Sequence, residues 1–138
     1  MTGTRAWSEA QAPSLDDMEA MARVAFDGLP ETFRALCGEV EIRVSEFPEA
    51  KVLDDLDLET EFDILGLFEG VGLAHDEAVA HTGALPNRVW LYRRPILDYW
   101  AEHEETLGAI VGHVLVHEIG HHFGLSDDDM EAIEAGTE

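Results

Sequence analysis

The chain has little positive charge. Lysine and arginine together number 8 against 30 aspartates and glutamates, which gives a formal net charge of −22. Phosphate backbones and anionic lipid headgroups repel such a surface, so nucleic-acid and membrane binding are not expected. A basic peptide or protein would be attracted to it. The simpler interpretation of the charge is a solvated acidic coat that keeps the protein soluble.

Cysteine is scarce, with one residue, and long apolar runs are lacking. The single Cys37 has no partner for an internal disulfide, which fits a reducing compartment. No apolar stretch approaches the roughly 18 residues that a membrane helix needs. The N-terminal residues lack the apolar core of a secretory signal. A cytoplasmic protein is therefore expected.

The length of 138 residues fits one domain, with no internal repeat and no linker. Residues 1–13 lack hydrophobic periodicity and end in Pro13, so a flexible N-terminal tail is expected there. Residues 14–138 are expected to form a single domain. Hydrophobic residues make up 46% of the chain, enough for an ordinary core.

Local patterns predict a mixture of helices and strands. Ser14, with Asp17 three positions later, has the pattern of a capping box and predicts a helix that ends at Gly28. A short helix is expected at 31–37, and alternation predicts a half-buried strand at 39–47, closed by Pro48. Weaker patterns predict a helix at 51–59, a short buried strand at 64–70, an irregular stretch at 72–87, a strand at 88–94 ended by Pro95, and a helical turn at 96–100.

The last third of the chain is predicted to be helical. Apolar periodicity indicates a helix over about 104–123, with Gly124 placed as the residue that ends it. A final short helix is expected after Ser126, with Asp129 completing its cap. Strands and helices alternate irregularly, so the fold class expected is α+β, with a small mixed or antiparallel sheet.

Histidines concentrate in this last third. His117 and His121 are four residues apart, so on a helix both imidazoles face one point. Glu118 follows the first of them, which completes the HExxH pattern of two metal ligands and a carboxylate general base. His113 is also four residues from His117, but one ion does not easily reach all three. Only the 117/121 pair includes a glutamate directly after its first histidine.

The residues after the histidines suggest a third ligand. Gly124 lies three residues after His121, and Asp127 lies three residues after Gly124. A glycine that tolerates positive φ lets the chain turn sharply, so the carboxylate of Asp127 is expected to swing back towards the imidazoles. Two histidines and one carboxylate leave a fourth position open, as in catalytic zinc sites. Asp128 and Asp129 are alternatives if the turn is longer. His113 is expected to be packed or to support a ligand, and His122 to be packed or solvated. His75 and His81 are expected to be exposed, with an approach to the site as the alternative.

The stretch HEIGHHFGLSD resembles the gluzincin and metzincin metallopeptidases. Together with the preceding LYRRPILDYW, it resembles the small bacterial zincin-like family known as minimal zincins. The resemblance implies a zincin-like α+β fold, one zinc ion on His117, His121 and Asp127, and Glu118 as general base. It also implies that the strand at 88–94 is a sheet edge that binds an extended peptide. Only residues 122–138 follow His121, which departs from larger proteases that have a downstream Met-turn, and Met130 follows too closely to be one.

Two functions follow from these observations. The first is a zinc-dependent metallopeptidase that hydrolyses peptide bonds, with basic peptides favoured, using a metal-activated water and Glu118. The alternative is a non-catalytic acidic binding module that retains a zincin scaffold with a structural, sensory or absent metal. Candidates for stabilising the oxyanion remain open among Tyr92, Tyr99, Arg93 and His81. The ligand set also suits iron or manganese, and the sequence sets no expectation for oligomeric state.

Overall fold

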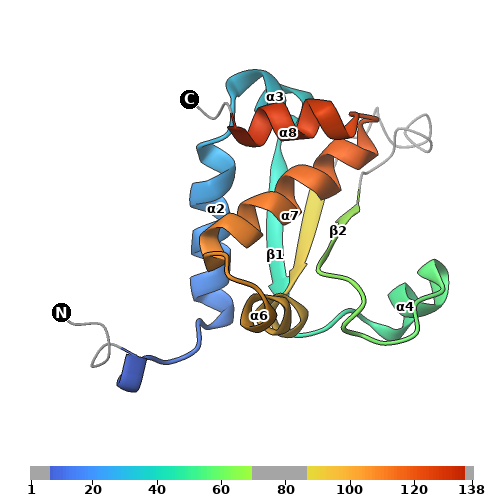
Figure 1. Ribbon diagram of the computed structural model, residues 1–138. Helices are drawn as coiled ribbons and strands as arrows, with labels where there is room; N and C mark the ends of the chain where they lie inside the picture. Colours follow the sequence, from blue (N-terminus) through green and yellow to red (C-terminus); the bar gives the residue numbers. More distant parts are fainter. Residues whose placement is uncertain (1–6, 70–86, 136–138) are drawn as a thin grey trace.

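The computed structural model describes residues 7–69 and 87–135. Helices flank a small sheet, in the order that the mixed pattern of the sequence predicts (Figure 1). The helices are α2 (Leu15–Asp27), α3 (Glu31–Cys37), α4 (Ala50–Leu56), α6 (Arg93–Glu102), α7 (Leu107–His122) and α8 (Asp127–Ala135), and the strands are β1 (Val40–Ser45), β2 (Gly66–Glu69) and β3 (Asn87–Tyr92). The α+β class is confirmed.

The three strands form one mixed sheet in the order β1-β3-β2. Strand β3 pairs parallel with β1, where Val89 lies opposite Ile42, and antiparallel with β2, where Val89 lies opposite Phe68. The prediction that 88–94 is a sheet edge is therefore wrong, because β3 is hydrogen-bonded on both sides. Among the described strands, β1 and β2 are the edges.

Helices α2 and α7 pack side by side against the sheet (Figure 1). Helix α2 contacts β1, and α7 contacts β2 and β3. The strands turn alternate residues towards these helices, as the period of two predicts. The core includes Met18, Ala22, Phe26, Val40, Ile42, Val89, Leu91, Ile96, Val111, Leu115 and Ile119.

Helices α2 and α7 begin at side-chain caps. Ser14 Oγ accepts the Asp17 amide at 3.0 Å, and the Asp17 carboxylate accepts the Ser14 amide at 2.9 Å, so the predicted capping box is confirmed. Helix α7 starts later than predicted, because the hydroxyl of Thr106 accepts the amide of Ala109 at 3.1 Å and caps the helix there. The helix predicted from residue 104 therefore begins at Leu107.

The boundary between β3 and α6 also differs from the expectation. The strand ends at Tyr92, and Arg93 already begins α6. Pro95 lies in the first turn of this helix, where a missing amide donor costs no intrahelical hydrogen bond. The helical turn expected at 96–100 is thus the middle of a ten-residue helix.

The turn between α7 and α8 has the predicted glycine geometry. Gly124 has a φ of 77°, and its amide donates to the carbonyl of His121 at 3.1 Å. The amide of Leu125 donates to the carbonyl of Gly120 at 2.9 Å, which completes a Schellman motif. Ser126 and Asp129 then cap α8 reciprocally, at 3.0 and 3.1 Å.

The described part of the chain contains no helix of the length and apolarity that crossing a bilayer requires. Arg93 Nε donates a hydrogen bond to the carbonyl of Pro13 at 2.6 Å. This bond ties the segment before α2 to the start of α6. The division into a flexible tail at 1–13 and a domain at 14–138 stays a prediction, and residues 1–6 lie outside the described residues.

Gly66 lets β2 approach α7 closely. A Cβ atom at this position would lie 2.7 Å from Val114 Cγ1 and 2.9 Å from the carbonyl oxygen of Trp90. A side chain would therefore push β2 away from both its neighbouring strand and the helix.

The Gly66→Ala substitution is expected to lower the free energy of unfolding by about 1–3 kcal/mol, because an added methyl group overpacks this contact. The matched control is Gly112→Ala in the interior of α7, where the added Cβ meets nothing within 4 Å. That control is expected to gain about 0.5–1 kcal/mol from helix propensity. Urea unfolding of both variants measures the difference, and equal stability of Gly66→Ala and the wild type would contradict the packing described.

Candidate metal centre

Helix α7 carries its histidines along one side. His113, His117 and His121 follow one another at intervals of four residues, and their rings touch in sequence. The ring centroids of His113 and His117 are 3.9 Å apart, and those of His117 and His121 are 5.7 Å apart. The buried residues of α7 point into the core and are Leu107, Ile110, Val111, Val114, Leu115, Val116, Ile119 and Gly120.

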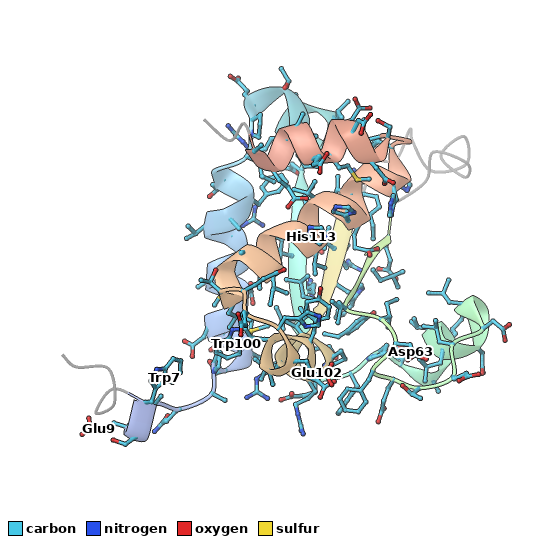
Figure 2. The ribbon with its side chains drawn as sticks, viewed as in Figure 1. Trp7, Glu9, Asp63, Trp100, Glu102 and His113 are labelled. Carbon is cyan, nitrogen blue, oxygen red and sulfur yellow. The ribbon has the colours of Figure 1, made fainter. Side chains whose placement is uncertain are left out.

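Glu134 on α8 faces two of these rings. Its Oε1 lies 3.1 Å from Nδ1 of His113, and its Oε2 lies 3.2 Å from Nε2 of His117. One ligand atom from each of the three residues lies within 4.8 Å of the other two. Figure 2 shows His113 near the middle of α7, with α8 passing across that helix. The described residues thus place two imidazoles and one carboxylate together.

The sequence-predicted ligands are only partly brought together. His117 and His121 share one side of α7, as the spacing predicts. Asp127 is exposed at the first position of α8. Within the described residues, neither His121 nor Asp127 belongs to a group of three ligand residues at the spacing found for Glu134. The set of His117, His121 and Asp127 stays a prediction.

The other candidate histidines lie apart from this group. His122 is exposed and its ring packs on Phe68, with centroids 4.4 Å apart, which agrees with the expectation that it is packed or solvated. His113, expected to be packed or to support a ligand, is instead exposed and in contact with Glu134. His75 and His81 lie outside the described residues.

Glu118 lies between the histidine side of α7 and the sheet edge. Its Cγ would be 3.5 Å from a Cβ built on Gly66, so its stem packs on β2. Burial raises the pKa of Glu118 above its usual value, and the neighbouring His121 opposes the shift. Burial also disfavours the charged form of His117 and so lowers its pKa, and the neighbouring His113 lowers it further. A neutral imidazole is the form that binds a metal ion.

Among the oxyanion candidates, Tyr92 is the one whose pKa the charge of Glu118 affects. Burial raises the pKa of Tyr92 to about 12, and the charges of Glu69, Glu49 and Glu118 contribute. Its phenol therefore stays protonated and able to donate a hydrogen bond. Tyr99 stacks on His103 at 3.8 Å, and Arg93 pairs with Glu46 at 2.9 Å. His81 lies outside the described part of the chain.

Two residues near the site, Met130 and Glu134, make contacts that the sequence did not predict. Met130 is fully buried, and a Cβ built on Gly120 would lie 2.5 Å from its sulfur, so α8 packs on α7 through this pair. Glu134 is four residues after Met130 and so shares its side of α8. That spacing was available in the sequence, but 30 acidic residues gave no reason to single out this one.

The comparison with known proteins agrees with this geometry. The sequence profile of a family described as zincin-like metallopeptidase matches residues 37–137, which include the sheet, α7 and α8. The chain belongs to the zincin-like metallopeptidase family. No curated protein matches this chain. The predicted resemblance to a zincin-like family is confirmed.

Membership of a zincin-like family implies a zinc ion, and the donors of α7 suit one. Zinc in catalytic sites takes two or three histidines, often with one carboxylate. The described residues supply imidazoles on one side of α7, at 113, 117 and 121, and carboxylates on the adjoining α8. The histidines of α7 and the carboxylates of α8 are therefore ligands of the kind that zinc prefers.

The Met130→Ala substitution is expected to lower the free energy of unfolding by about 2–5 kcal/mol, because it leaves a cavity between α7 and α8. Met130→Leu conserves most of the volume and is expected to cost less than about 1.5 kcal/mol. Urea unfolding measures both changes. A Met130→Ala protein as stable as Met130→Leu would show that this contact does not hold α8 in place.

Proposed function

We propose that this zincin-like metallopeptidase hydrolyses peptide bonds with Glu118 as the general base. The observation that carries the proposal is the position of Glu118. Its stem packs against Gly66 at the edge strand β2, and its helix presents two metal-binding imidazoles on the adjoining side. A carboxylate between a substrate-binding edge and a pair of histidines is placed to move a proton during hydrolysis.

The proposed zinc ligands are His117, His121 and Asp127. The two imidazoles supply nitrogen from successive turns of α7, and the Schellman turn at Gly124 returns the chain towards them. Asp127 is exposed in the first turn of α8, so its side chain is free of buried packing and able to approach. The carboxylate of Glu134 would have to leave Nε2 of His117 for this set to close.

Zinc, when bound, supplies polarisation of the scissile carbonyl and acidification of water. The protein's own contribution is proton transfer and positioning. Glu118 accepts a proton from the attacking water and passes it to the leaving amine.

The substrate is proposed to add to β2 as an extended strand. Of the described strands, β2 is the edge nearest α7, since β3 is paired on both sides. An added strand alternates its side chains between the two faces of the sheet. In β2, Gly66 lies on the face of the sheet that packs against α7 and Glu118. Leu67 and Glu69 lie on the opposite face of the sheet.

A cavity on that opposite face favours a basic side chain. It has a volume of about 100 Å³ and is lined by Ser45, Phe47, Glu49, Val52, Leu67, Glu69, Trp90 and Tyr92. Aromatic walls with two carboxylates suit a long cationic side chain, whose stem is apolar and whose end is charged. This cavity and the net charge of −22 support a peptide substrate with lysine or arginine near the cleaved bond.

The decisive experiment compares wild type with Glu118→Gln in peptide cleavage with added zinc. Removing the base is expected to lower kcat/KM by about 100- to 10,000-fold while the zinc Kd stays unchanged. The matched control is Glu105→Gln, an exposed residue outside α7, which is expected to cleave like the wild type. Equal cleavage by wild type and Glu118→Gln would rule out the proposed role.

The alternative, a binding module with a structural metal, is separated by chelation. A structural ion contributes its binding energy to folding, so its removal should strongly lower the melting temperature. The described core of this protein consists of buried apolar residues and includes none of the histidines of α7. A small shift on chelation, measured by calorimetry, is therefore expected for the peptidase. The cytoplasmic location inferred from the single cysteine remains a proposal.

The basic subsite is tested with paired substrates that differ in one residue, lysine or glutamine. The Glu49→Gln substitution is expected to reduce the preference for lysine by about threefold to tenfold, because an exposed or half-exposed charge pair contributes about 1 kcal/mol. Asp54→Asn on α4 lies outside the cavity lining and is expected to leave the preference unchanged. Preferences that stay equal in wild type and Glu49→Gln would contradict the subsite.

A further inference from the structure

The contact between Glu134 and two histidines has the form of a metal site. Its two oxygens reach different rings, at 3.1 Å from His113 and 3.2 Å from His117. In a tetrahedral zinc site with bonds of about 2.1 Å, ligand atoms lie about 3.4 Å from one another. The two distances to Glu134 are close to that value, and one ligand atom from each of the three residues lies within 4.8 Å of the other two, so side-chain rotations would be needed to close the site around an ion.

We propose that His113, His117 and Glu134 form a second zinc position, one helical turn before the His117–His121 pair and sharing His117 with it. The chemistry of the ligand set is two imidazoles and one carboxylate, which suits zinc and related divalent ions. This proposal rests on the proposed function in one respect: it takes the position at His117 and His121 to be the catalytic one.

Sharing His117 makes the two positions exclusive. Nε2 of His117 is the atom that faces Glu134, and one nitrogen lone pair binds one ion. An ion held with His113 therefore takes His117 away from His121. The protein binds one zinc equivalent, distributed between the two positions.

The two zinc positions differ in how far they lie from Glu118 around and along the helix. With 100° and 1.5 Å per residue, Glu118 is turned about 80° and displaced about 1.5 Å from the midpoint of residues 117 and 121. From the midpoint of 113 and 117 it is turned about 120° and displaced about 4.5 Å. An ion in the second position is thus farther from the proposed base, and this position stores zinc without supporting hydrolysis.

Helix α8 holds Glu134 in place for this role. Met130, one turn earlier, is fully buried against Gly120 of α7. The reciprocal cap between Ser126 and Asp129 fixes the start of the helix. Glu134 is therefore presented to α7 by a packed helix rather than by a loop. The side chain of Glu134 is about one-third exposed, and that of His113 more than half exposed, so an ion can enter from solvent.

Zinc titration of the full chain tests the proposal, with affinity and stoichiometry measured by competition with a chromophoric chelator. His121→Ala removes only the His117–His121 position and is expected to bind one equivalent with a Kd within about tenfold of the wild type. Adding Glu134→Gln to His121→Ala is expected to weaken binding by at least about 100-fold. The matched control adds Glu131→Gln, an exposed glutamate of the same helix, and is expected to bind like His121→Ala.

Three results would overturn the second position. One is loss of zinc from His121→Ala alone, at a wild-type melting temperature that shows the variant folds. Another is equal binding by the variants that pair His121→Ala with Glu134→Gln and with Glu131→Gln. The third is two zinc equivalents in the wild type, which would show that His117 is not shared. Peptide cleavage by wild type and Glu118→Gln decides the proposed function separately, so either idea can fail without the other.

Discussion

Helix α7 meets two demands at once, and the arrangement of the domain depends on it. Seven of its buried residues belong to the hydrophobic core. A row of imidazoles follows at every fourth residue, at 113, 117 and 121, with neighbouring rings in contact. Because four residues advance a helix by 400°, successive imidazoles are each turned by about 40°. The row therefore winds slowly around the helix, and it never enters the core that α2 and the sheet occupy.

The close approach of β2 to α7 joins this helix to the edge of the sheet. With no side chain at Gly66, the strand lies against Val114 and the stem of Glu118. The same contact removes water from around the carboxylate, which is why burial raises the pKa of Glu118. Packing at one glycine thus sets both the distance between Glu118 and the sheet edge and the electrostatic environment of its carboxyl group.

Local features of the fold were predictable because they depend on nearby residues. The cap at Ser14, the alternation of β1 and the turn at Gly124 each follow from a few consecutive positions. The central position of β3 was not predictable, since strand order depends on pairing between segments far apart in the sequence. The shared side of His117 and His121 followed from their spacing alone. Glu134 was missed because its approach to His117 depends on how α8 packs on α7.

Both carboxylates that could complete a metal site belong to α8, one at its first residue and the other in its last turn. A rigid helix that pivots about a contact near its centre lowers one end as it raises the other. The sulfur of Met130 against Gly120 is such a contact, four residues before Glu134 and three after Asp127. A tilt of α8 about this contact would therefore move Asp127 and Glu134 in opposite directions relative to α7.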